Sequence, residues 1–101
     1  MALRDIVDNS LSFVPTEILK RLQKEQVRFY CWHKIAEYDD GYTIWYDVPA
    51  QKFVVRVESS VWDGRSREAI EETLDDKALL ARLTKISSEG KIVSLAWLNM
   101  D

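Results

Sequence analysis

The segment from residue 27 to residue 36 alternates between two sets of side chains with a period of two. The first set is mainly apolar and is made of Val27, Phe29, Cys31, His33 and Ile35. The second set is mainly polar or aromatic and is made of Arg28, Tyr30, Trp32, Lys34 and Ala36. Successive side chains of a β-strand point to opposite faces of a sheet. The segment is therefore predicted to be a strand with one face in the core.

Two further strands are predicted after it, each reached through a turn. Asp39-Asp40-Gly41 is typical of a hairpin turn, because glycine readily takes a positive φ. Residues 42–48 then form a second strand, Pro49-Ala50-Gln51 turn the chain again, and residues 52–61 form a third. Three consecutive strands joined by turns predict an antiparallel meander.

Helices are predicted on both sides of this meander. Residues 2–9 have weak helical character, and a helix over residues 15–25 begins at Pro15, where a first-turn proline loses no hydrogen bond. Residues 66–88 form a helical region that divides into 66–73 and 75–88, because Thr73-Leu74-Asp75-Asp76 resembles a helix start. Gly90 is predicted to end the second of these helices.

Residues 91–98 are predicted to form a last strand, apolar on both faces, that is covered on both sides or lies inside the sheet. The fold class is α+β in the order α-β-β-β-α-α-β: an antiparallel sheet of about four strands, with helices packed on one face. A length of 101 residues with few glycines and prolines predicts a single domain over residues 1–101. The position of the last strand, beside the first or beside the third, stays open.

The cellular setting is constrained by three features of the chain. The single cysteine excludes an internal disulfide, and the acidic N-terminus does not resemble a signal peptide. No apolar stretch approaches the length of a membrane span. We therefore expect a cytoplasmic protein that does not bind membranes.

A single register gives the meander one apolar face. With a two-residue turn at Asp40-Gly41, Ile35 lies opposite Tyr46; with a four-residue loop after Val48, Val48 lies opposite Phe53. The predicted core face is Val27, Phe29, Cys31, Ile35, Ile44, Tyr46, Val48, Phe53, Val55 and Val57. The cross-strand neighbours predicted on the other face are Lys34 with Asp47, Trp45 with Arg56, and Thr43 with Glu58.

Cys31 and His33 are the only cysteine and the only histidine, two residues apart on the predicted core face. Zinc needs three or four ligands, and a Cys–His dyad needs a polar, partly exposed pocket. Neighbours such as Phe29 favour instead a buried thiol and a histidine with one nitrogen bonded to a neighbour. No catalytic constellation, metal site or cofactor is predicted, although carboxylates of an unrecognised enzyme are not excluded.

The predicted binding surface is the outward face of the meander. Its residues combine aromatic rings with positive charges: Arg28, Tyr30, Trp32, Lys34, Trp45 and Arg56. Tryptophan, tyrosine and arginine are enriched at protein interfaces, so we favour a non-enzymatic protein-binding module of the inhibitor, immunity or adaptor type.

Three other readings of this chain stay open. The N-terminal segment or a second copy in a homodimer could cover the outward face. The aromatic rings could stack on single-stranded nucleic acid while the cations hold phosphates, a reading that Asp47 and Glu58 weaken. An acidic cluster on the second helical region could also steer a basic partner.

Overall fold

A computed structural model describes residues 12–35, 38–60 and 69–99 of the chain. Within these ranges it contains two helices and five strands. In chain order they are α1 (Pro15–Lys24), β1 (Val27–Ile35), β2 (Tyr38–Asp47), β3 (Lys52–Ser60), β4 (Ile70–Leu74), α2 (Asp76–Ser88) and β5 (Lys91–Asn99). The weak helix predicted over residues 2–9 lies outside the described residues.

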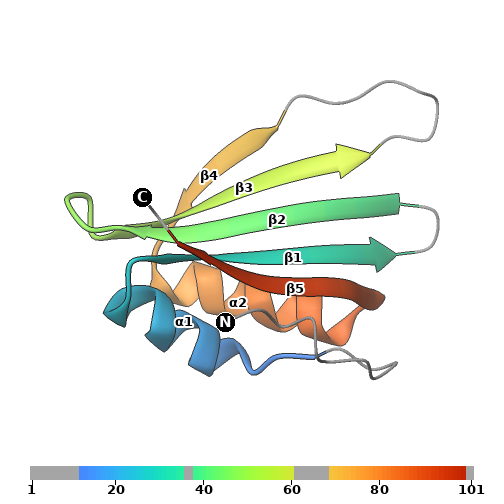
Figure 1. The fold of residues 1–101 in the computed structure, drawn as a ribbon, viewed down its shortest axis with the longest axis horizontal. Coiled ribbons are helices and arrows are strands. Elements are labelled where there is room, and N and C mark those ends of the chain that lie inside the picture. Colours follow the sequence, from blue (N-terminus) through green and yellow to red (C-terminus); the bar gives the residue numbers. More distant parts are fainter. Residues whose placement is uncertain (1–11, 36–37, 61–68, 100–101) are drawn as a thin grey trace.

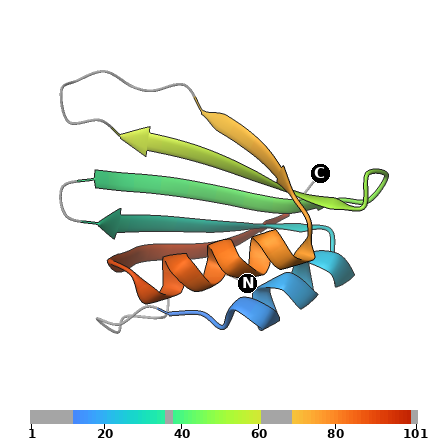
Figure 2. The same cartoon turned by 180° about the vertical axis from the view of Figure 1, so that it is seen from behind.

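The five strands form one antiparallel sheet in the order β4-β3-β2-β1-β5. Both views of the fold place α1 and α2 on the same side of this sheet (Figure 1, Figure 2). The predicted α+β class, the meander and the helices on one face are therefore confirmed. The last strand lies beside β1, which settles its position.

Helix α1 confirms the helix predicted from Pro15, which occupies the first turn. Arg21 and Lys24 stand in the last turn, where positive charge stabilises the helix dipole. Ile18 and Leu22, four residues apart, are buried against the sheet.

Helix α2 confirms the helix predicted over residues 75–88. Its N-cap is not Thr73, the first residue of the predicted helix start. The carboxylate of Asp75 accepts a hydrogen bond from the backbone N–H of Ala78 at 2.8 Å. Asp75 is thus the N-cap, while Thr73 belongs to the preceding strand. Gly90 follows the helix with a φ of 67°, the left-handed conformation that ends many helices.

The helix predicted over residues 66–73 is wrong for the part that the structure describes. Ile70–Leu74 form the strand β4, which pairs with β3 and gives the observed order α-β-β-β-β-α-β. Leu74 packs against the core, and Val57 and Ile70 lie opposite each other. Strand pairing with the edge of β3 stabilises this segment more than the weak helical preference of Glu71 and Glu72 would stabilise a helix.

The turn predicted at Asp39-Asp40-Gly41 is also wrong, because these residues lie inside β2. Ile35 lies opposite Tyr38, eight positions earlier than the predicted Tyr46.

The register between β2 and β3 differs from the prediction by two positions. Tyr46, not Val48, lies opposite Phe53. The three predicted cross-strand neighbours are consequently wrong: the observed pairs are Lys34 with Asp39, Trp45 with Val54, and Thr43 with Arg56.

Five of the ten residues of the predicted core face are nevertheless fully buried, and three more are partly buried. Phe29, Cys31, Ile44, Phe53 and Val55 are at most 1% exposed, and they pack against apolar side chains of α1 and α2. Two predicted core residues are exposed instead. Ile35 is 40% exposed as the last residue of β1, and Val48 is 52% exposed because it lies in the turn after β2.

Strand β5 is an edge strand, so the predicted position inside the sheet is wrong, and its exposed apolar residues show that it is not fully covered. Val93 and Leu98 are 46% and 45% exposed. The pairing with β1 shifts between Trp32 and His33: Trp32 lies opposite Ser94, and His33 lies opposite Ile92. Val93 is therefore the extra residue of a β-bulge.

Candidate functional site

The structure places the six predicted binding residues on the face of the sheet opposite the two described helices. Strand β1 contributes Arg28, Tyr30, Trp32 and Lys34, β2 contributes Trp45, and β3 contributes Arg56. Their positions follow from strand alternation, because the neighbouring odd-numbered residues of β1 are the buried ones. We call these six residues the outer aromatic face.

Several members of the outer aromatic face lie close together. The guanidinium of Arg28 lies 5.0 Å from the ring centroid of Trp45, within range of a cation–π interaction. Tyr30 lies opposite Thr43, which lies opposite Arg56, so these three form a row across the central strands. Trp32 and Trp45 are both partly exposed.

Gly41 explains how Trp32 lies on the sheet. A Cβ atom at Gly41 would come within 2.8 Å of two carbons of the Trp32 ring and 3.4 Å of the Tyr30 hydroxyl. The ring of Trp32 therefore covers the backbone of β2 in the space that a side chain would fill. An aromatic ring over a cross-strand glycine restores contacts that glycine lacks.

The charges on this face are of both signs. Arg56 Nε lies 3.4 Å from the Glu58 carboxylate, and the register places Arg56 opposite Glu71 and Lys34 opposite Asp39. The Arg56–Glu58 pair is about half exposed, so it contributes on the order of 0–1 kcal/mol to stability. Among the described residues of this face, Arg56 and Lys34 therefore each have an acidic neighbour.

Cys31 and His33 lie on the other face, in the core, and match the structural interpretation of this pair. Cys31 is fully buried, and burial raises the pKa of its thiol to about 12, so the reactive thiolate does not form near neutral pH. His33 is 2% exposed, and its Nε2 is hydrogen-bonded to the backbone carbonyl oxygen of Glu89. In the described ranges, no group of three or more histidine, cysteine, aspartate or glutamate side chains is arranged to hold a metal ion.

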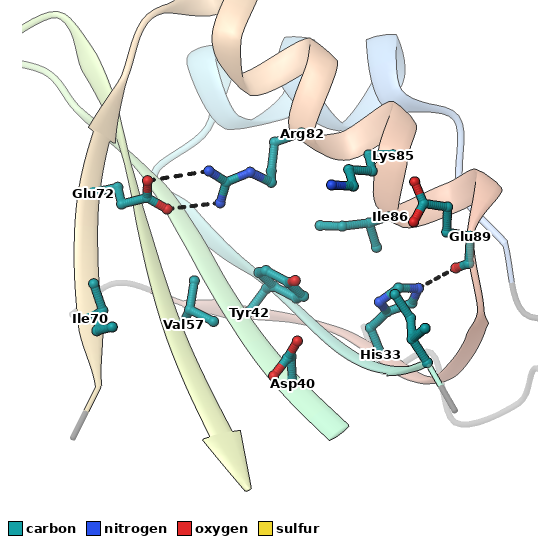
Figure 3. A pocket seen from close by; sticks show the side chains of 11 residues that line it. His33, Asp40, Tyr42, Val57, Ile70, Glu72, Arg82, Lys85, Ile86 and Glu89 are labelled. Atoms are coloured by element: carbon teal, nitrogen blue, oxygen red, sulfur yellow. Dashed lines mark hydrogen bonds and ion pairs between the residues drawn. The ribbon is translucent and has the colours of Figure 1, made fainter. Parts of the chain in front are cut away.

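A pocket of about 600 Å³ opens between α2 and the inner face of β1, β2, β3 and β4 (Figure 3). Its apolar walls include Val57, Ile70 and Ile86, and its polar groups include His33 and Tyr42. This pocket is not among the features predicted from the sequence. Polar residues at inward-facing strand positions could have indicated a pocket. Asp40 was not among them, because it is predicted to lie in a turn.

One end of the pocket is fixed by a two-point ion pair. Arg82 on α2 donates from its two terminal nitrogens to the Glu72 carboxylate on β4, at 2.9 and 3.3 Å. The hydrogen bond from Arg82 lowers the pKa of Glu72, and the same bond raises the pKa of Arg82. Burial, followed by the charge of Asp40, raises the pKa of Tyr42, so its hydroxyl keeps its proton at neutral pH.

Comparison of the chain with protein-family models, with curated proteins and with solved structures found no match. Neither α1 nor α2, the helices of the described ranges, is long and apolar enough to cross a membrane.

Proposed function

We propose that this chain is a non-enzymatic protein-binding module that docks on its partner through the outer aromatic face. The observation that carries the proposal is the arrangement of Trp32, Trp45 and Arg28. Two partly exposed tryptophans and a stacked arginine share the face of the sheet that neither described helix covers. Such residues contribute most of the binding energy at many protein interfaces.

The chemistry of the face favours a protein over a nucleic acid. Glu58 and Glu71 stand beside Arg56, and acids at this position would repel phosphates. A protein surface can match both signs, with carboxylates for Arg28 and Lys34 and an apolar depression for a tryptophan ring. We therefore expect a partner with a mixed-charge surface around an apolar centre, as bound by inhibitors, immunity proteins or adaptors.

Site-specific photo-crosslinking tests this proposal. A photoreactive residue at Thr43, which lies opposite Tyr30 of the outer aromatic face, should crosslink one discrete protein in host lysate. The same residue at Lys77, which is exposed on α2, should not. The crosslink at Thr43 should disappear when Trp45 is changed to Ala, while circular dichroism and thermal unfolding stay close to those of the parent chain. Equal crosslinking from both positions, or none from Thr43, would contradict the proposal.

Two further measurements separate the competing occupants of this face. Fluorescence anisotropy with single-stranded oligonucleotides at low salt should show no saturable binding, and binding that Arg56→Ala abolishes would indicate nucleic acid instead. Light scattering with iodide quenching tests the second copy of this chain. A dimer with protected tryptophans that Trp45→Ala converts to a monomer would assign the face to self-association.

A further inference from the structure

The pocket between α2 and the inner sheet face has the dimensions and the walls of a small-molecule site. Its volume of about 600 Å³ lies within the range of about 300–1,000 Å³ found for ligand pockets. Ile86 forms a buried wall, and Ile70, which is 60% exposed, stands at the rim. The apolar side chains come from both the sheet and α2, so a ligand body would lie between the two layers.

His33 provides a polar group without a partner at one end of this pocket. A carbonyl oxygen only accepts hydrogen bonds, so the bond to Glu89 requires the proton on Nε2. In a neutral imidazole the other nitrogen, Nδ1, then carries a lone pair. Nδ1 is buried and has no hydrogen-bond partner within the described ranges. Figure 3 shows the ring held at Glu89 by one nitrogen, with Tyr42 and Ile86 beside its other side.

The remaining polar groups indicate what a ligand should offer. Nδ1 needs a donor, whereas Lys85 donates only and the protonated hydroxyl of Tyr42 can donate. A hydroxyl group satisfies both requirements, because it donates one hydrogen bond and accepts others.

The charges of the pocket disfavour an anionic ligand. Arg82 is neutralised by Glu72, and the carboxylates of Asp40 and Glu89 line the pocket together with Lys85. The described lining holds three acids, Asp40, Glu72 and Glu89, against two bases, Arg82 and Lys85, so an anion would gain no net attraction there. An uncharged ligand needs no such attraction.

We propose that this pocket binds an uncharged small molecule with an apolar body and a hydroxyl group that donates to Nδ1 of His33. The ring of His33 and the walls of α2 then form one site, separate from the outer aromatic face. A buried acceptor that gains a donor stabilises the complex more than an exposed one, since no water competes for it.

The test uses phenol as the probe and anisole as its matched control. Anisole replaces the O–H of phenol by O–CH3, so it keeps the ring and loses the donor. Titrations of the ¹⁵N-labelled full chain should give saturable NMR shifts at Ile86, Val57 and the His33 ring nitrogens. Phenol should bind about ten-fold more tightly than anisole, the ratio expected for one buried hydrogen bond. Equal affinities, shifts scattered outside the pocket, or no saturation by phenol would overturn the proposal.

A pair of variants on β4 locates the binding without touching the core. Ile70→Trp adds bulk at the rim of the pocket, and Thr73→Trp adds the same ring on the opposite face of the same strand. Both positions are exposed, so both variants should fold. Ile70→Trp should weaken phenol binding about five-fold or more, and Thr73→Trp should leave it unchanged. The reverse order, or equal effects, would place the phenol elsewhere and refute the site.

Discussion

Replacement of Gly90 by alanine is expected to destabilise the fold strongly. Gly90 has a φ of 67°, a conformation that costs an alanine about 1–2 kcal/mol. A Cβ at this position would also overlap the backbone carbonyl of Lys34 and come within 2.6 Å of Ile35 Cγ1. The clash is with a backbone carbonyl near the end of β1, so it cannot be relieved by rotating a side chain.

The expected loss follows from three contributions. The backbone conformation costs about 1–2 kcal/mol, and overpacking typically costs about 1–3 kcal/mol. Alanine restricts the unfolded chain more than glycine does, which returns about 0.4–1 kcal/mol. The net loss of unfolding free energy should therefore be about 2–4 kcal/mol. Because Nε2 of His33 would lie 3.2 Å from the new Cβ, its bond to Glu89 should be disturbed as well.

Urea unfolding followed by tryptophan fluorescence measures this loss. The unfolding free energy of a small protein typically falls by about 1–3 kcal/mol per molar urea. The urea concentration at the unfolding midpoint should therefore fall by about 1–3 M. Gly90→Asn is the decisive comparison, because asparagine tolerates positive φ but still carries a Cβ. The steric argument predicts that Gly90→Asn recovers only the part of the loss due to φ and still loses the overpacking part, about 1–3 kcal/mol. Recovery of Gly90→Asn to within about 0.5 kcal/mol of the parent chain would refute the clash and leave only the φ preference.

Three further predictions concern stability and reactivity. Asp75→Ala removes the cap on the N–H of Ala78 and should cost about 1 kcal/mol in chemical unfolding, whereas Asp75→Asn should cost less. Cys31, with its pKa raised to about 12 and no exposure, should not react with a thiol reagent at pH 8 in the native state and should react fully in urea. The ion pair with Arg82 lowers the pKa of Glu72 in the folded state, so its stabilisation is present above the usual glutamate pKa and is lost as pH falls through the lowered value. The stability advantage of the parent chain over Glu72→Gln should therefore be seen at pH 7 and disappear in acid, and an advantage that persisted at pH 2 would contradict this assignment.

The faces of the meander could be predicted from the sequence even though its register could not. The partner of Ile35 differs from the prediction by eight positions, and that of Phe53 by two. Both differences are even, and strand alternation has a period of two, so each side chain keeps its predicted face. This is why Phe29, Ile44 and Val55 are buried as expected while every predicted cross-strand pair is wrong.

The turn between β1 and β2 was mispredicted because Gly41 has a role that local sequence does not show. Asp39-Asp40-Gly41 has the composition of a hairpin turn, but in β2 the glycine makes room for the ring of Trp32 on the neighbouring strand. Such a contact depends on which strands pair. Local sequence propensity cannot predict this contact, because the contact requires Trp32 and Gly41 to lie on paired strands.

The pocket was missed for a related reason. Its residues come from β1, β2, β3, β4 and α2, and the segment that forms β4 is predicted to be a helix. A helix there would have placed Glu72 on a solvated surface. As a strand, the segment turns Ile70 and Glu72 toward α2, where Arg82 meets the glutamate (Figure 3). The polar end of the pocket therefore exists only once β4 is in place.

The outer aromatic face and the pocket meet at two consecutive residues of β1. Trp32 points to the outer face and His33 to the pocket, and the bulge at Val93 lies opposite the step between them. The bulge lets Ser94 stay opposite Trp32 while Ile92 stays opposite His33. Gly90 and Glu89 precede β5 in the chain, and the carbonyl oxygen of Glu89 accepts a hydrogen bond from Nε2 of His33. Without the extra residue, either the pairing beside Trp32 or the contact at His33 would have to move, so the bulge sets the alignment of both surfaces.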